Sequence, residues 1–415
     1  MSTNQDMPTQ SRGHATLNIG SEFAYDSPAA AVGAIERELA PLPIETIALD
    51  EACGRVLGER IVADRPSPAL DVSAMDGYAV RLADLKLGDM TVAGEISIGR
   101  ECPAMPSGAA MRIVTGAPVP ADADAVIKRE DVDELGGSIR IRSLDVKQGQ
   151  CIRRRGENIE AGGGVLEPGI LITPAVVGAL ASFGVTTPRV HRRVRVAIIV
   201  TGDEVLAAES SPKAWQLRDS NGPALAAMTS ATPWISLVSR RSAPDDPAAL
   251  REAVSAALAE ADAIFLTGGV SMGNKDFVPG VLRELGVRTL FHKLPQRPGK
   301  PVLCGIAPGE HARPVFALPG NPVSVLVTAR RLATPGLRRL AGFAAGEVPV
   351  LMRLDVPAEN RSGMWWHRPV RRTPEGWVAL VEGRGSGDFV HAARADGFIE
   401  MPPGASGEGP WAFRA

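Results

Sequence analysis

The spacing of apolar positions changes several times along the chain, and these changes predict where its domains lie. Between residues 191 and 342, short apolar runs alternate with stretches of helical periodicity. Val194–Val200 and Ala263–Leu266 have the length and composition of buried strands, and an aspartate followed by proline predicts a helix over Asp246–Glu260. Alternating strands and helices predict an α/β domain with a doubly wound, mostly parallel sheet.

The remaining segments have different patterns, which together predict a multidomain chain. Residues 65–150 contain short alternating runs between glycine and proline clusters, as expected for a β-rich insert domain. The segments on either side, 22–64 and 151–190, have similar sequence patterns that differ from that of the insert, and they predict a discontinuous N-terminal domain. Residues 343–415 predict a small C-terminal β-domain, and the polar residues 1–21 predict a disordered N-terminus.

Composition and charge narrow the classes of function. The chain has 415 residues, with 45 Lys and Arg against 47 Asp and Glu, and a formal net charge of −2. This balance, with only 4% aromatic residues, offers neither the basic surface nor the stacking platforms that nucleic-acid binding uses. The 4 cysteines form no C-x-x-C pair, so neither a disulfide framework nor a zinc site is predicted. Because no apolar run is long enough to span a membrane, we expect a cytoplasmic protein without a membrane partner.

One stretch combines a buried strand, a loop with three glycines and a carboxylate, Asp276, ahead of a predicted helix. A tight turn alone would explain the glycines. However, Glu204 and Asp246 also follow predicted strands, and such loops meet at the carboxyl edge of a parallel sheet, where ligands bind. Taken singly, Asp246 is a helix cap and Glu204 a solvated acid. Taken together, the three carboxylates predict a cleft that holds a hard cation, Mg²⁺.

A set of short motifs occurs along the chain in the order found in one family. They are Ser73-Ala-Met-Asp-Gly-Tyr-Ala-Val, Val114-Thr-Gly-Ala-Pro, Arg153-Arg-Arg-Gly-Glu, Thr201-Gly-Asp-Glu, Asp219-Ser-Asn, Thr267-Gly-Gly-Val-Ser-Met-Gly, Pro298-Gly-Lys-Pro and Leu318-Pro-Gly-Asn-Pro-Val-Ser. This series resembles the molybdopterin molybdenumtransferases, the family of bacterial MoeA and the gephyrin E-domain.

The resemblance implies an enzyme of molybdenum cofactor biosynthesis. Such a transferase would insert molybdate into the dithiolene of adenylylated molybdopterin, with Mg²⁺-dependent release of AMP. It also implies an elongated homodimer, in which the insert domain of one subunit faces the α/β cleft of the other and completes a shared active site.

The resemblance also assigns roles to individual residues. The catalytic residues would be Asp76 and Thr115 of the insert and Glu204, Asp246 and Asp276 of the cleft, and the last three would also hold the metal. Residues that contact the molybdopterin substrate would be Asp219, Gly268, Gly269, Ser271, Arg297, Pro298, Lys300 and Pro301. This set is chemically reasonable because cationic side chains and glycine-loop amides can neutralise both molybdate and the pyrophosphate link of the substrate.

Three positions depart from the family pattern and leave alternatives open. Asn158 replaces an aspartate, Arg297 replaces a frequent lysine, and Val72 replaces an asparagine. Arg297 keeps the charge with a different geometry, whereas Asn158 removes one charge. The departures are compatible with a specialised paralogue or with a catalytically weakened molybdopterin-binding scaffold. Molybdopterin adenylyltransferase is another alternative, but it has Gly-Gly-Thr-Gly where this chain has Gly-Gly-Val-Ser, and it lacks the insert.

Overall fold

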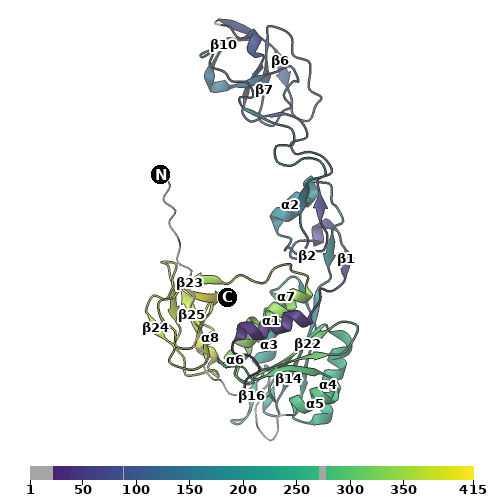
Figure 1. The fold of residues 1–415 in the computed structure, drawn as a ribbon, viewed down its shortest axis with the longest axis vertical. Coiled ribbons are helices and arrows are strands. Elements are labelled where there is room, and N and C mark those ends of the chain that lie inside the picture. The colour runs from purple at the N-terminus through teal and green to yellow at the C-terminus, as the bar shows by residue number, and fades with distance from the viewer. Residues whose placement is uncertain (1–21, 87, 271–276) are drawn as a thin grey trace, which may run out of the picture.

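The chain is elongated, with its insert domain at one end and its α/β and C-terminal domains at the other (Figure 1). The computed structural model describes residues 22–86, 88–270 and 277–415. The predicted disorder of residues 1–21 therefore concerns a segment outside the described residues. None of the helices in these three ranges is long and apolar enough to cross a membrane.

The α/β domain is built on a six-stranded sheet with the order β17-β14-β18-β22-β21-β19. Its strands are β14 (Val194–Thr201), β17 (Ile235–Ala243), β18 (Ala263–Thr267), β19 (Arg288–His292), β21 (Leu303–Ala307) and β22 (Arg313–Leu318). The pairs β14–β17, β14–β18 and β18–β22 are parallel, whereas β21 is antiparallel to both of its neighbours. The sheet is therefore mixed, because the loop 308–312 is too short for a crossover and turns β22 back beside β21.

Helices cover both faces of this sheet. They are α1 (Pro28–Glu38), α3 (Asn221–Ser230), α4 (Pro247–Glu260), α5 (Val278–Glu284), α6 (Pro322–Thr328), the π-helical segment η4 (Ala329–Ala333) and α7 (Thr334–Leu340). Alternate strand residues point to opposite faces, so Ile198 and Phe265 belong to one core and Ile199 and Leu266 to the other. The parallel strands are buried on both faces, which explains why they consist of continuous apolar runs.

Helix α1 packs against the α/β domain, although the sequence analysis placed residues 22–64 in the N-terminal domain. Its buried residues Ala31 and Ile35 join the same core as Phe316 of β22. The contact with α7 is close at Gly336, where a Cβ atom would lie 2.9 Å from Ile35 Cγ2. The helix begins as predicted, with Ser27 Oγ accepting a hydrogen bond from the Ala30 amide at 3.2 Å.

The N-terminal domain combines two separate segments of the chain. Its elements are β1 (Ile44–Thr46), the 3₁₀ turn η1 (Leu49–Glu51), β2 (Val56–Leu57), β3 (Ile61–Val62), β12 (Gly164–Leu166), α2 (Pro174–Ser182) and β13 (Arg189–His191). Leu57 and Ile61 share one core with Ile172 and Leu180. Two further strands, β4 (Val72–Ser73) and β11 (Ile152–Arg153), pair antiparallel near the insert.

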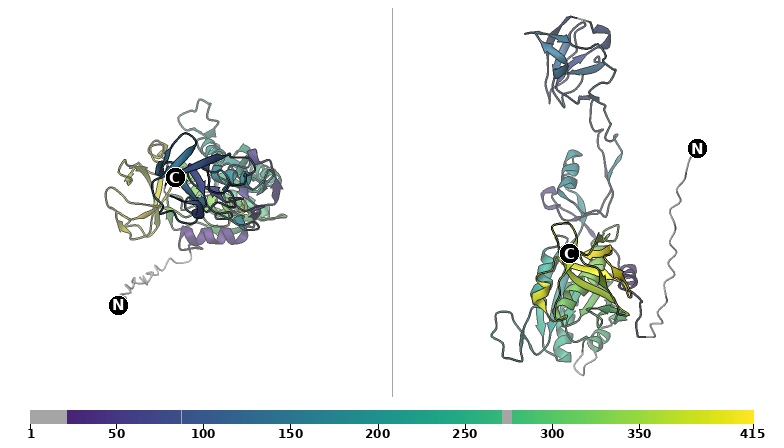
Figure 2. Two further views of the ribbon diagram at one scale, coloured as in Figure 1. Left: turned by 90° about the horizontal axis from the view of Figure 1, so that it is seen from above. Right: turned by 90° about the vertical axis from the view of Figure 1, so that its left-hand side faces the viewer.

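The insert carries a second six-stranded sheet, with the order β8-β5-β7-β6-β10-β9. Its elements are β5 (Gly77–Val80), η2 (Leu82–Asp84), β6 (Asp89–Ile96), β7 (Ala110–Ile113), β8 (Ala125–Lys128), η3 (Arg129–Asp131), β9 (Val132–Glu134) and β10 (Ser138–Ile141). Figure 1 and the right-hand view of Figure 2 show this domain standing well apart from the α/β domain.

The C-terminal domain shares its main sheet with the α/β domain. The elements are β20 (Gln296–Arg297), β23 (Val350–Met352), β24 (Ala358–Glu359), β25 (Trp365–Arg372), β26 (Val378–Leu380), α8 (Phe389–Ala392), β27 (Gly397–Met401), β28 (Ser406–Gly407) and β29 (Trp411–Arg414). Strand β20 comes from the loop after β19 and pairs in parallel with β25. This pairing holds the segment that contains Arg297 against the C-terminal domain.

Candidate functional site

The loops that leave β14, β18 and β22 meet at the carboxyl edge of the α/β sheet and border a cleft of about 620 Å³. Thr201, Thr267 and Leu318 end these three adjacent strands. Side chains from all three loops line the cleft, together with residues from the start of α3 and from the C-terminal domain. The lining includes Glu204, Asp219, Asn221, Asp245, Gly268, Gly269, Pro301 and Asn321.

The glycine loop after β18 can lie close to the loop after β14 because its first residue has no side chain. Gly268 has a φ of 93°, and a Cβ atom there would lie 2.5 Å from the carbonyl oxygen of Thr201. Gly269 follows with a φ of 61°, which is again a left-handed conformation. Both glycines line the cleft as predicted. The remainder of the loop, with Ser271 and Asp276, lies outside the described residues.

The structure gives different roles to two adjacent aspartates, of which the sequence predicted only Asp246 as a site residue. Asp246 accepts hydrogen bonds from the amides of Ala248 at 3.0 Å and Ala249 at 2.8 Å, so it is the N-cap of α4. Asp245 lines the cleft instead and accepts a hydrogen bond from Thr201 Oγ1 at 3.0 Å. Asp246 lies at the predicted edge of the sheet, but its carboxylate is used by the helix, and Asp245 takes its place in the cleft.

Two of the other predicted acids lie in the cleft. Glu204 is exposed and lies in the loop that follows β14. Asp219 precedes α3 and accepts a hydrogen bond from the Gly222 amide at 2.8 Å. With Asp245, these side chains give the cleft several carboxylate oxygens, which are the donors that Mg²⁺ prefers.

The described residues do not by themselves form the predicted metal site. Among them, no group of three or more His, Cys, Asp and Glu side chains is arranged to hold an ion. Of the three carboxylates proposed as ligands, Glu204 lines the cleft, Asp246 caps a helix, and Asp276 lies outside the described residues. The cleft offers carboxylate oxygens, which a hard cation prefers as ligands. The carboxylates that line it are not the three that were predicted to bind the ion.

A second hollow, of about 330 Å³, lies between the segment around Arg297 and the C-terminal domain. The Arg297 guanidinium stacks on Trp366, with its Cζ atom 3.5 Å from the ring centroid, and Arg368 approaches the same ring at 4.3 Å. Arg368 also donates to Glu382 at 2.7 Å, whereas the buried Nε of Arg297 has no hydrogen-bond partner. Burial, and then the nearby charge of Arg368, lower the pKa of Arg297. Two cations held together in this way favour an anionic ligand.

The loop that carries Arg297 is held by a buried amide. Gln296 is fully buried and donates through Nε2 to the carbonyl oxygen of Gly299 at 3.1 Å. A Cβ atom at Gly299 would lie 2.3 Å from Thr328 Cγ2, and φ is 94°, so only glycine fits this turn. The packing of this turn therefore requires the glycine of the Pro-Gly-Lys motif, in addition to the substrate-binding role that the resemblance implies.

The loop residues predicted to bind substrate are divided between the two hollows. Arg297 and Pro298 line the smaller hollow, and Pro301 lines the cleft. Lys300 lines neither hollow; its Nζ lies 2.9 Å from Glu22 in a partly exposed ion pair. Because such a pair contributes little, a ligand phosphate could replace Glu22 at low cost.

Asp76 and Thr115 lie together in the insert domain. The Thr115 amide and Oγ1 both donate to Asp76 Oδ1, at 2.7 Å and 2.8 Å. The backbone hydrogen bond from Thr115 is the main cause that holds the pKa of Asp76 below its usual value, so the group is a carboxylate at neutral pH. Within one chain, the insert and the α/β domain are at opposite ends of the molecule (Figure 1).

Comparisons with known proteins cover both regions that carry these residues. The family description "MoeA N-terminal region (domain I and II)" matches residues 27–184, and "Probable molybdopterin binding domain" matches residues 197–339. A molybdopterin molybdenumtransferase from Synechococcus elongatus is 35% identical over 350 residues, which are 81% of this chain and 86% of the relative. The chain belongs to the molybdopterin molybdenumtransferase family. The predicted family is thereby confirmed.

Other members of the molybdopterin molybdenumtransferase family agree. The Haemophilus influenzae relative is 37% identical over 310 residues, which are 74% of this chain and 75% of its own length. The crystal structure of a molybdopterin biosynthesis moeA protein from Pyrococcus horikoshii OT3 aligns with a TM-score of 0.79 at 26% identity, over 94% of this chain and 98% of that chain. Because residues 27–184 include the insert, these matches favour this family over the adenylyltransferases.

Three residues of the two hollows were not predicted from the sequence, namely Asp245, Trp366 and Arg368. Asp245 is adjacent to the residue that was chosen, and only the start of α4 distinguishes the two. Trp366 and Arg368 are alternate residues of β25, so they share a face of that strand. That spacing was visible in the sequence, but nothing local indicated that Arg297 would face it.

The departure at Asn158 lies outside both hollows. Asn158 accepts a hydrogen bond from Arg153 Nη2 at 2.6 Å and donates to Ser67 Oγ at 3.1 Å. These partners lie beside the connection between the N-terminal domain and the insert. The missing charge therefore affects a structural junction rather than the described cleft.

Proposed function

We propose that this chain inserts molybdate into the dithiolene of adenylylated molybdopterin and releases AMP. The observation that carries the proposal is that the two hollows are neighbours, lined by the same two segments of the chain. The loop 297–301 contributes Arg297 and Pro298 to one and Pro301 to the other. The segment 383–389 likewise contributes Ser386 to the smaller hollow and Phe389 to the cleft. A substrate with two anionic parts could span both.

The smaller hollow suits an oxyanion such as molybdate. The guanidiniums of Arg297 and Arg368, which stack on Trp366 and line this hollow, supply donors in a partly desolvated place. Charge-assisted hydrogen bonds of this kind are stronger than neutral ones. The larger cleft, with its glycine loop, then accepts the pyrophosphate-linked nucleotide at the carboxyl edge of the sheet, where nucleotides bind in such folds.

Mg²⁺ is part of this proposal as the cofactor. Glu204 would be one ligand, and Asp276 would be another. When bound, a divalent cation would offset negative charge on the phosphates of the substrate and on the departing AMP. The residues of this chain then have the task of orienting two anions against each other and keeping them in contact.

The proposal also includes a homodimer with shared active sites. Asp76 and Thr115 match the active-site motifs of the family, and Thr115 holds Asp76 in its ionised form. Their domain and the α/β domain lie at opposite ends of the same chain (Figure 1), so the pair is too distant to act at the cleft of its own subunit. The insert of a second subunit would bring this pair to the cleft of the first.

Complementation between inactive variants tests the function and the shared site together. The assay is molybdate-dependent AMP release from adenylylated molybdopterin with Mg²⁺, for Asp76→Ala, Glu204→Ala and a mixture refolded or co-expressed together. Each variant alone should be inactive. The mixture should regain roughly a quarter of wild-type activity, because half of the dimers are mixed and each has one intact site.

A matched control uses Glu204→Ala with Arg297→Ala. Glu204 lines the cleft and Arg297 the neighbouring smaller hollow, so both belong to the same half of the shared site. Mixed dimers therefore retain no intact site and should stay inactive. Recovery in this control, or no recovery with the first pair, would contradict the shared site. Full activity of a monomer would also contradict the shared site. Wild-type protein that releases no AMP under these conditions would refute the proposed reaction itself.

A further inference from the structure

A third hollow, of about 380 Å³, lies at the opposite edge of the α/β sheet, where the N-terminal domain joins it. It is lined by Glu45, Arg55, Arg192, Arg193, Arg195 and Ser236. Strand β14 begins at Val194 and β17 at Ile235, so this is the amino edge. Four arginines in one hollow are not explained by the catalytic cleft, which lies at the carboxyl edge.

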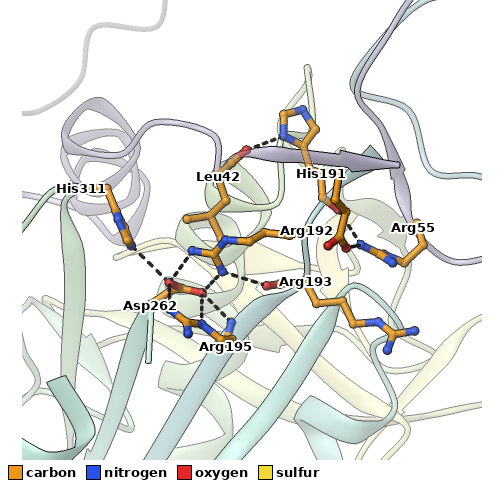
Figure 3. Close-up of polar contacts among 9 residues, drawn as sticks. Leu42, Arg55, His191, Arg192, Arg193, Arg195, Asp262 and His311 are labelled. Carbon is orange, nitrogen blue, oxygen red and sulfur yellow. Dashed lines mark hydrogen bonds and ion pairs between the residues drawn. The ribbon is translucent and has the colours of Figure 1, made fainter. Parts of the chain in front are cut away.

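A buried carboxylate organises this cluster (Figure 3). Asp262 is fully buried and accepts two hydrogen bonds from Arg192, at 2.6 Å and 2.8 Å. The Arg195 amide donates to it at 2.9 Å, and His311 Nε2 lies 3.2 Å away. Although burial opposes it, these donors together hold the pKa of Asp262 well below its usual range. Asp262 is therefore a permanent anion that positions Arg192 and Arg195.

The hollow has more cationic side chains than carboxylates to pair with them. Arg55 forms an ion pair with Glu45 and donates to the His191 carbonyl oxygen at 2.9 Å, but its buried Nε has no partner. The exposed Arg193 guanidinium has no side-chain partner among the described residues (Figure 3). Four guanidiniums less the two carboxylates, Glu45 and Asp262, leave an excess of two positive charges.

We propose that this hollow is a binding site for a phosphate-type dianion. The excess charge matches a dianion, and planar guanidiniums present paired donors that suit tetrahedral oxyanions. The exposed guanidinium of Arg193 leaves donors available, and Ser236 adds a hydroxyl. The partners come from two domains, because Arg55 follows η1 in the N-terminal domain whereas Arg195 and Ser236 lie on the α/β sheet.

A ligand here would therefore bridge the N-terminal and α/β domains. The insert is carried by the N-terminal domain (Figure 1). Binding would add contacts on both sides of the junction, and a ligand that binds this arrangement of the two domains stabilises it. The site is separate from the reaction, so its occupancy should change local protection without being required for AMP release.

The test uses inorganic phosphate at low ionic strength, with binding measured by calorimetry and located by hydrogen exchange. Phosphate should protect amides near 192–196 and 235–236 in the wild-type protein. Arg193→Ala should raise the Kd roughly ten-fold, the loss expected for one charge-assisted hydrogen bond. Ser236→Asp, which places a negative charge in the hollow, should abolish this binding. The matched control is Arg371→Ala, an exposed arginine of β25 that has no side-chain partner among the described residues.

Three results would overturn the proposal. The first is phosphate binding that Arg193→Ala leaves unchanged. The second is an equal loss in Arg371→Ala, which would show only non-specific attraction to surface charge. The third is protection confined to the loops of the catalytic cleft, which would place the bound phosphate there. Exchange patterns without phosphate show whether each variant is folded, so a misfolded variant is not mistaken for loss of the site.

Discussion

Single substitutions of Asp245 and Asp246 give the most direct test of the different roles that the structure assigns to these two side chains. Asp246 accepts two amide hydrogen bonds at the start of α4, at 3.0 Å and 2.8 Å. Replacing an N-cap aspartate by alanine costs about 0.5–2 kcal/mol. Because both bonds are lost, we expect a cost of about 1–2 kcal/mol for Asp246→Ala, or a melting point lower by about 2–8 °C. Asn caps as well as Asp, so Asp246→Asn should be nearly neutral.

Asp245→Asn should have the opposite effect. Its side chain lines the cleft and accepts one hydrogen bond, from Thr201 Oγ1 at 3.0 Å. The amide keeps the shape and an acceptor oxygen, so the folded state should lose at most about 1 kcal/mol. The cleft loses a negative charge, and we expect kcat/KM to fall by about ten-fold or more, equivalent to about 1.4 kcal/mol of transition-state stabilisation.

The measurement pairs AMP release with a thermal melt for all three variants. We expect Asp246→Asn to retain both activity and stability, Asp246→Ala to lose stability more than activity, and Asp245→Asn to lose mainly activity. If Asp246→Asn were inactive while Asp245→Asn turned over normally, the division of roles would be refuted. Asp246 would then act in catalysis despite its bonds to α4.

Two further predictions concern the central loop and acid stability. Asp276→Ala should abolish AMP release and lower the free energy of unfolding by no more than the loss of a helix cap, about 0.5–2 kcal/mol. Near wild-type turnover at saturating Mg²⁺ and molybdate would contradict the proposed metal-binding role. His367 is fully buried, and burial lowers its pKa to about 4 from an ordinary value of 6.5, so its stability contribution is complete above pH 6.5 and is lost as the pH falls to about 4. The loss approaches about 3 kcal/mol, and His367→Gln should show a smaller drop in the urea midpoint between pH 7 and pH 4.5; an unchanged drop would exclude His367 as its cause.

The sequence by itself determined the family, the strands of the α/β domain and the edge of the sheet at which ligands bind. Local signals were sufficient for these features. The apolar runs of β14 and β18 are buried on both faces, so their pattern depends little on which neighbours cover them. Glu204 and Gly268 lie in the cleft because every loop that leaves a parallel strand emerges at the same edge.

Only the tertiary structure decided which side chains act together. Asp245 and Asp246 have the same chemistry, and the geometry of the first turn of α4 alone directs one to the helix and the other to the cleft. The meeting of Arg297 with Trp366 and Arg368 depends on β20 pairing with β25, a contact between segments almost 70 residues apart in sequence. The arginine hollow likewise needs Arg55 and Arg195 to meet across a domain junction. Long-range pairing leaves no local periodicity, so the sequence contained these residues without indicating their partners.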